Sequence, residues 1–135
     1  MTIQNSTTVR NAMLDAIETA IGTGAVLKIF TGSQPANCAA ANSGTELVSY
    51  TLASDWAAAA SGGSKAFNDV PISGTAIAAG TAGHYRIYAS NGTTCHEQGS
   101  VSETGGGGDV IISNDNIEVG QAVNVTGWTK TAPGA

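Results

Sequence analysis

The stretch GHYRIYASNGTTCHEQGSV, residues 83–101, decides the fold that we predict for this chain. It places Asn91-Gly92 between two runs of aromatic and β-branched residues, which is typical of a β-hairpin because both residues tolerate the positive φ angles of a type I′ turn. A two-residue turn would put Arg86 opposite Glu97, an oppositely charged cross-strand pair. The sequence therefore predicts a β-rich domain organised around this hairpin.

Further short runs of β-branched and apolar residues flank the hairpin and are separated by turn residues. Residues 54–60 read instead as a capped turn followed by a short helical piece, and residues 72–82 as either a strand at 74–78 or an irregular crossing. Seven or eight short strands with regularly spaced turns indicate a mainly β fold, an antiparallel β-sandwich of the jelly-roll kind. The other predicted strands are residues 25–31, 46–52, 65–70, 109–113 and 121–131.

One amphipathic helix is predicted near the N-terminus, with Ser6 or Thr7 as its N-cap and Gly22 at its end. Its opposite side carries polar and charged residues between Arg10 and Thr19. The apolar stripe has two interpretations: it packs on the protein's own sheet, or it docks on a partner subunit. The stripe consists of Val9, Ala12, Met13, Ala16, Ile17, Ala20 and Ile21.

Length and composition indicate one domain that covers much of its surface with partners. The 135 residues support a single core, which we expect to span residues 7–131, between a flexible arm at 1–6 and a tail at 132–135. Only 11% of residues are charged, and a lone globule with so little charge is poorly protected against association.

Charge and hydropathy also argue against two classes of partner. The net charge is -5 and no basic cluster is present, which disfavours nucleic acid binding. No run approaches the roughly 18 apolar residues of a membrane helix. The first ten residues lack the apolar core of a secretory signal, so we expect synthesis in the cytoplasm.

The residues that most often carry chemistry do not form a recognisable constellation. His84 and His96 share the hairpin but are expected on opposite faces, which disfavours a zinc site. Cys95 adjoins His96, yet neighbours in a strand point to opposite faces, so this pair does not suggest a nucleophile and its base. We therefore expect no enzymatic activity, no cofactor and no metal site.

Two further features are interpreted as structural rather than functional. Four glycines at 105–108 lack the lysine and the following Ser or Thr of a phosphate-binding loop, so we expect a flexible strand connection. Cys38 and Cys95 are interpreted as free buried thiols, because two cysteines without a secretory signal seldom form a bridge.

Four segments together resemble small structural proteins of tailed bacteriophages, over about residues 7–131. They are TTVRNAMLDAI at 7–17, VLKIFT at 26–31, GTAGHYRIY at 80–88 and TCHEQGSV at 94–101. The likeness is to the cement, or decoration, proteins of short-tailed phages. It implies a jelly-roll-like virion protein on the capsid exterior that clamps neighbouring major capsid protein subunits, made in the host cytoplasm and catalysing no reaction.

The sequence leaves the mode of attachment open. We expect the chain to bind the major capsid protein and to associate with itself as a homodimer or homotrimer. Two other functions stay open: a tail or fibre module, and a carbohydrate-binding sandwich that stacks sugars on Trp56, Trp128 or Tyr88. The candidate partner contacts lie in the arm, a long loop and the last strand: Thr2, Ile3, Gln4, Asn5, Ser6, Thr7, Asn37, Asn42, Thr129, Lys130 and Thr131.

Overall fold

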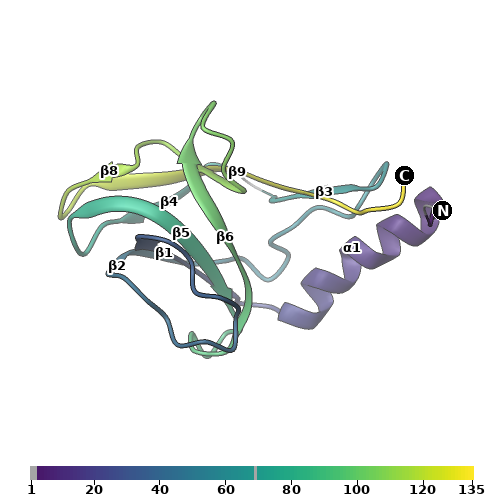
Figure 1. The fold of residues 1–135 in the computed structure, drawn as a ribbon, viewed down its shortest axis with the longest axis horizontal. Helices are drawn as coiled ribbons and strands as arrows, with labels where there is room; N and C mark the ends of the chain where they lie inside the picture. Colours follow the sequence, from purple (N-terminus) through teal and green to yellow (C-terminus); the bar gives the residue numbers. More distant parts are fainter. Residues whose placement is uncertain (1–2, 69) are drawn as a thin grey trace.

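The computed structural model describes residues 3–68 and 70–135. Within these residues one helix, α1 (Thr7–Ile21), accompanies nine short strands (Figure 1). The strands are β1 (Val26–Thr31), β2 (Glu46–Thr51), β3 (Ser64–Ala66), β4 (Ile72–Thr75), β5 (Gly80–Tyr88), β6 (Cys95–Glu103), β7 (Val110–Ile112), β8 (Asn116–Ile117) and β9 (Ala122–Thr131).

The strands form a single curled sheet in the order β2-β1-β5-β6-β7-β9-β3, with β4 paired to β9 and β8 paired to β5. β6 and β7 run parallel and the other pairs are antiparallel. Curling brings the segment after β4 back to β2, where the Ile77 amide donates to the Leu47 carbonyl at 2.8 Å. The prediction of a mainly β chain is confirmed, but the sheet is mixed rather than purely antiparallel, and a jelly-roll topology stays a prediction.

The central hairpin forms with a different register from the predicted one. Near its tip Tyr88 pairs with Cys95, but further along Ile87 pairs with Glu97 and Arg86 with Gln98. His96 is therefore an extra, bulged residue, which moves Glu97 to the face opposite Arg86. The predicted Arg86–Glu97 pair is wrong because of this bulge.

The hairpin turn is also longer than predicted. The Gly92 amide donates to the Ala89 carbonyl at 2.9 Å, and the Ala89 amide donates to the Thr94 carbonyl at 2.9 Å. The Asn91 side-chain oxygen accepts from the Thr93 and Thr94 amides. Side-chain bonding by Asn91, rather than a two-residue type I′ turn, thus closes the hairpin.

The bulge places the Glu97 carboxylate inside the molecule. Its Oε1 atom accepts from the Tyr85 hydroxyl at 2.6 Å and from Trp128 Nε1 at 3.1 Å, and it lies 3.1 Å from Lys130 Nζ. Burial raises the pKa of the Tyr85 hydroxyl, and the neighbouring Glu97 charge raises it further. This polar cluster connects β5, β6 and β9 at the centre of the sheet.

The glycine run is a close-packed corner rather than a flexible connection. Parallel neighbours usually need a crossover of about a dozen residues, yet only six separate β6 from β7. A Cβ atom on Gly108 would lie 2.6 Å from the Ser102 amide nitrogen, and one on Gly106 would lie 2.7 Å from Ser102 Cβ. Glycine is required here because the returning chain passes directly against β6.

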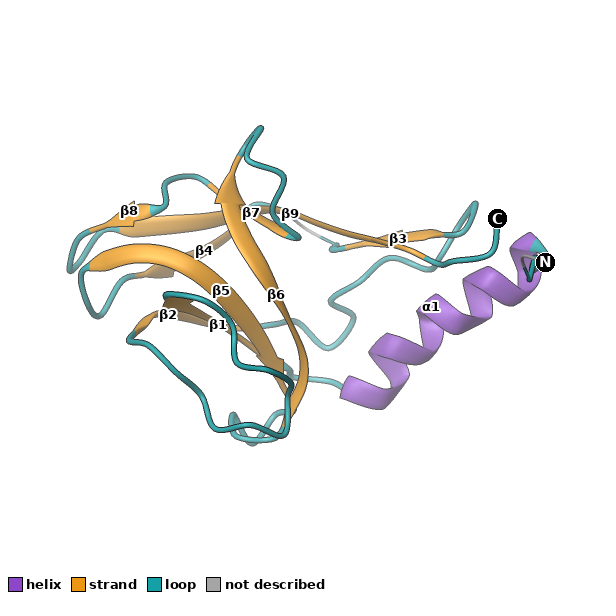
Figure 2. Cartoon of the chain, in the orientation of Figure 1, coloured by secondary structure: helices purple, strands orange, loops and turns teal. Residues whose placement is uncertain are grey.

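β3 and the end of β9 form a two-stranded ribbon that extends beyond the curled part of the sheet, with α1 alongside it (Figure 2). At the base of this ribbon Trp56 packs edge-on against Trp128, and Phe67 stacks on Trp128. The helical piece predicted at 57–60 is wrong. That segment is extended, and the Ala58 amide donates to the Ala66 carbonyl at 2.9 Å.

Candidate interaction surface

Helix α1 begins and ends where the sequence predicts. Ser6 is its N-cap, and the Ser6 hydroxyl accepts from the Val9 amide at 3.3 Å. Gly22 ends it with a φ of 90°, and its amide donates to the Glu18 carbonyl. The boundaries are thus set by local chemistry.

The helix attaches to the rest of the molecule by a side that combines polar side chains with the buried Leu14 and Ile21. Three side chains spaced by four and three residues, Asn11, Asp15 and Glu18, form a stripe that we call the anchor stripe. They accept hydrogen bonds from the amides of Gly63 at 2.9 Å, Ala60 at 2.9 Å and Ala57 at 3.2 Å, respectively. The anchor stripe thereby supplies acceptors to a backbone segment that has no neighbouring strand on that side.

Lys65 on β3 completes the attachment. Its ammonium lies 2.8 Å from Asp15 Oδ1 and 3.1 Å from Glu18 Oε2, and its side chain is only 1% exposed. Burial lowers the pKa of Lys65, but hydrogen bonds to Asp15 and Glu18 outweigh it, so the pKa lies above its ordinary value. Hydrogen bonds from Lys65 and the Ala60 amide lower the pKa of Asp15. Both groups are therefore held in their charged forms.

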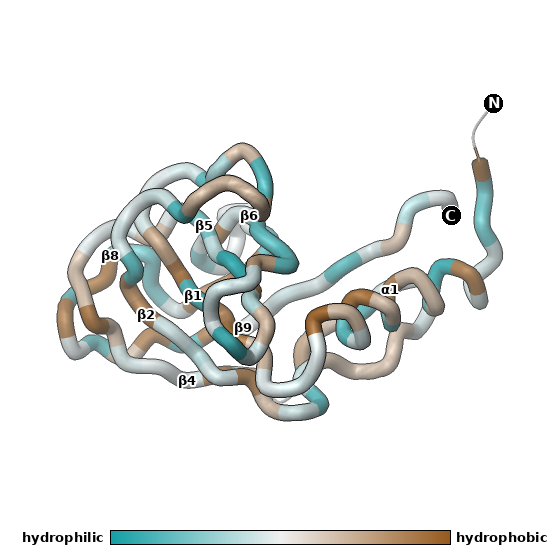
Figure 3. Tube along the Cα trace, turned by 90° about the horizontal axis from the view of Figure 1, so that it is seen from below, coloured by the Kyte–Doolittle hydropathy of each residue, from teal (hydrophilic) through white to brown (hydrophobic). Residues whose placement is uncertain are grey.

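Because the polar side faces inward, most of the apolar stripe faces solvent. Ile21 is buried and Ile17 is partly buried, but Val9 is 46% and Met13 43% exposed. The interpretation that the stripe packs on the protein's own sheet is therefore wrong for most of its residues. Figure 3 shows brown, apolar segments along α1. We call the exposed residues the helix face: Val9, Ala12, Met13, Ala16 and Ala20.

Two shallow grooves border the helix face. One, of about 300 Å³, lies between the C-terminal half of α1 and His96 of β6. The other, of about 220 Å³, lies between α1 and the end of the ribbon, where Lys130, Thr131 and Pro133 line it. Met13 and Ile17 line both grooves, so the surface runs without interruption across the helix.

The predicted contact residues of the arm and the last strand meet near this surface. Lys130 and Thr131 line the second groove, and Thr129 pairs with Ala66 in the ribbon. The Asn5 amide donates to the Gly134 carbonyl at 2.7 Å, which joins the arm to the tail. Ile3 and Gln4 are exposed, Ser6 caps the helix, and Thr7 is its first residue, while Thr2 lies outside the described residues.

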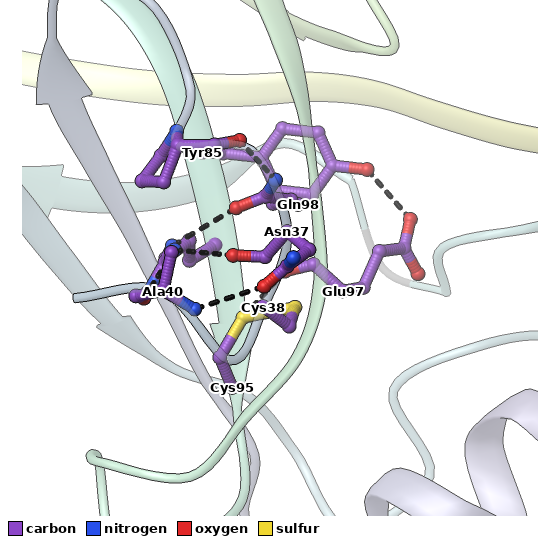
Figure 4. The surroundings of a disulfide bond; sticks show 9 residues. Asn37, Cys38, Ala40, Tyr85, Cys95, Glu97 and Gln98 are labelled. Atoms are coloured by element: carbon purple, nitrogen blue, oxygen red, sulfur yellow. Dashed lines mark hydrogen bonds between the residues drawn. A yellow bond between two sulfur atoms is a disulfide. The ribbon is translucent and has the colours of Figure 1, made fainter. Parts of the chain in front are cut away.

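Asn37 and Asn42 lie elsewhere, on the loop between β1 and β2, which folds back over the sheet. Here the structure corrects the sequence: Cys38 and Cys95 form a disulfide (Figure 4). The loop brings their Cα atoms to 5.3 Å across a sequence separation of 57. Sequence could not reveal this pairing because it depends on the path of an irregular loop.

The sequence did not indicate which residues hold this loop. The Arg86 guanidinium, buried at the sheet surface, donates to the carbonyls of Asn37 at 3.1 Å and Ala40 at 3.0 Å. Gln98 donates to the Pro35 carbonyl at 2.6 Å. An open depression of about 570 Å³ lies between the loop and the sheet. Arg86 and Gln98 are cross-strand neighbours. The predicted register paired Arg86 with Glu97 instead, so it did not place these two loop-binding side chains together.

Among the residues that the structure describes, the histidines and Glu97 do not converge on one site. His84 is buried with Nδ1 2.9 Å from the Gly32 carbonyl, His96 is exposed, and Glu97 lies on the sheet face opposite His84. Within residues 3–68 and 70–135, no three His, Cys, Asp or Glu side chains are grouped as metal ligands. Over the same part of the chain, no helix is long and apolar enough to cross a membrane.

The sugar-stacking alternative fails on burial. Trp56, Trp128 and Tyr88 are all buried, so they cannot form the exposed platform that this function needs. No protein-family model matches the chain, and comparisons with curated proteins and with solved structures give no significant match. The helix face and its two grooves are therefore the candidate functional site on physical grounds.

Proposed function

We propose that this chain is a virion structural protein, a capsid cement protein that binds the outside of a phage head and links major capsid protein subunits. The observation that supports the proposal is the bare helix face. Val9 and Met13 are exposed while Lys65, Asp15 and Glu18 are used to hold the helix from its polar side. The inner side of α1 also buries Leu14 and Ile21, but its outer side exposes Val9, Met13 and three alanines where a surface helix usually carries polar residues.

Such an orientation is costly for a protein that remains alone in water. Burying apolar surface contributes about 25 cal/mol for each Å² removed from water, and an isolated domain obtains this by turning its apolar stripe inward. Here the stripe is held outward by at least three hydrogen bonds and two ion-pair contacts. A surface kept in this way is suited to binding another protein.

A cement role also suits weak individual contacts. When many copies bind a symmetric shell, each further contact of a bridging protein becomes effectively intramolecular, so modest surfaces give strong attachment. The alternative of a tail or fibre module relies on the same helix face and differs only in where the protein sits in the virion.

The test is cryo-electron microscopy of virions that carry the protein. Density at regular positions on the outside of the head supports the proposal, whereas density confined to the tail overturns it in favour of the tail module.

A second measurement addresses the arm. Deleting residues 1–4 leaves the Ser6 cap and the Asn5–Gly134 hydrogen bond in place. We expect occupancy on heads to fall while the melting temperature stays the same. Unchanged occupancy would remove the arm from the attachment surface.

A further inference from the structure

We propose that the depression between the β1–β2 loop and the sheet is a binding site for one carboxylate group, held between Arg86 and Lys28. The charged side chains that line it are Lys28, Glu46 and Arg86. The site is independent of the cement role and shares no lining residue with the two grooves beside the helix face. The carboxylate belongs either to a small organic acid or to an acidic side chain of a partner protein.

Arg86 carries a buried charge that has only neutral partners. The residue is 3% exposed, and it takes part in none of the ion pairs formed within residues 3–68 and 70–135. Its Nε donates to Gln98 Oε1 at 3.2 Å, and its Nη2 donates to the carbonyls of Asn37 and Ala40. A charge removed from water in this way favours the binding of a counter-ion.

The Nη1 nitrogen of Arg86 keeps its hydrogen atoms for a ligand. No hydrogen bond within the described part of the chain uses Nη1. Among the same residues, the buried side-chain atoms without a partner are His84 Nε2 and Glu97 Oε2, so Nη1 still reaches solvent. Because two carbonyls occupy Nη2, a carboxylate oxygen binds Arg86 end-on at Nη1 rather than in a bidentate contact.

Lys28 supplies the second cation. It pairs with Arg86 across β1 and β5, and side chains paired in this way point to the same face with Cβ atoms about 4.5–5.5 Å apart. Lys28 Nζ lies 2.9 Å from Glu46 Oε1, and an ammonium has further donors for a second oxygen. Like charges placed opposite each other repel, so a carboxylate between Lys28 and Arg86 stabilises both.

The charges of the depression fit a carboxylate better than a phosphate. Lys28 and Arg86 contribute two positive charges and Glu46 one negative charge, which gives the lining a net charge of +1 in a chain of net charge -5. One carboxylate neutralises this charge. A phosphate with about two negative charges would leave the site negative, beside the carboxylate of Glu46.

The site is already formed without its ligand. The Cys38–Cys95 disulfide fixes the loop to β6 (Figure 4), and Gln98 donates to the Pro35 carbonyl at 2.6 Å. A ligand therefore does not have to order the loop, which favours binding. Asn42, a partner contact predicted from the sequence, lines the same depression.

Titration of the purified chain with sodium acetate tests the site. We expect saturable shifts in the nuclear magnetic resonance signals of the amides of residues 39–42 and 92–93, against sodium chloride of matched ionic strength. Inorganic phosphate at the same concentration should give smaller shifts. The absence of saturable shifts with acetate would overturn the site, and tighter binding of phosphate would overturn the assignment to a carboxylate.

Three variants separate the site from a general effect of charge, and Arg86 is left in place because it also holds the loop. Lys28→Met removes one donor, so acetate should bind about tenfold more weakly. Ala41→Glu adds a carboxylate to the lining and should compete with acetate. Ala79→Glu adds the same charge in the exposed turn before β5 and should not. Unchanged affinity in both K28M and A41E would overturn the assignment to Lys28 and Arg86.

Occupancy on phage heads distinguishes the two sources of the carboxylate. If it is an acidic side chain of a partner protein, A41E should occupy heads severalfold less than A79E. If it is a small acid, the two variants should occupy heads equally while acetate still binds the wild type. Because the titration needs only the purified chain, failure of the carboxylate site and failure of the cement role are distinguishable.

Discussion

The carboxylate of Asp15 on α1 lies 2.8 Å from the ammonium of Lys65 on β3. This contact joins the helix to the ribbon from the helix's polar side. Glu18 contacts the same ammonium at 3.1 Å, so one buried lysine holds two successive turns of α1. The direction in which the helix face points follows from this arrangement.

Replacing Lys65 with methionine should weaken the attachment of α1. Two carboxylates lose their cation, and hydrogen bonds to charged groups are worth ~1.5–3 kcal/mol each when buried, so we expect the free energy of unfolding to fall by at least about 2 kcal/mol. Urea denaturation measures it. Lys28→Met is the matched control, because the Lys28–Glu46 pair is partly exposed and should cost less than about 1 kcal/mol. Equal losses for the two variants would contradict the anchoring role of Lys65.

Acid should loosen the same contact. The pKa of Asp15 is lowered by its hydrogen bonds from Lys65 and Ala60, so its contribution is present above the unfolded-state pKa of 3.8 and is lost as pH falls below it. Unfolding measured between pH 6 and pH 2 should therefore show a smaller acid-induced loss of stability in Asp15→Asn than in the wild type. Identical pH profiles would show that Asp15 is not a stabilising carboxylate.

Removing the Cys38–Cys95 disulfide should destabilise the chain substantially. The bridge closes a loop with a sequence separation of 57, for which the chain-entropy estimate is about 4 kcal/mol. The double variant Cys38→Ser/Cys95→Ser should show this loss in chemical denaturation, and dithiothreitol should affect the wild type but not the variant. A wild type that is insensitive to the reductant under unfolding conditions would mean that the bridge is absent.

The glycine corner should not tolerate a substitution that a glycine on β9 accepts. Gly108→Ala would place a methyl group 2.6 Å from the Ser102 backbone, so we expect a loss of about 1–3 kcal/mol, as for other overpacked positions. Gly127→Ala is the control, because its methyl group would meet Ile111 at 3.6 Å, an ordinary contact. Thermal unfolding of both variants would show whether the corner is closely packed, and equal melting temperatures would indicate a loose connection.

Local sequence patterns determined most of the secondary structure. The helix limits followed from Ser6 and Gly22, because caps act within one turn of the chain. β1, β2 and β9 lie where runs of β-branched residues predicted them. The hairpin was placed correctly, but its register was not, because the bulge at His96 depends on burying Glu97 beside Tyr85 and Trp128.

Only the tertiary structure decided which side of α1 faces solvent and that Cys38 meets Cys95. Periodicity identifies an apolar stripe but not its partner, since the stripe looks the same whether it covers the protein's own sheet or awaits another chain. Here the backbone amides of residues 57–63 and the Lys65 ammonium needed acceptors, and the polar side of α1 provided them. Hydrogen bonding of those donors stabilises the fold more than burial of the alanine side chains would. Because the donors and the alanines belong to segments far apart in the chain, no single stretch of sequence shows which effect prevails.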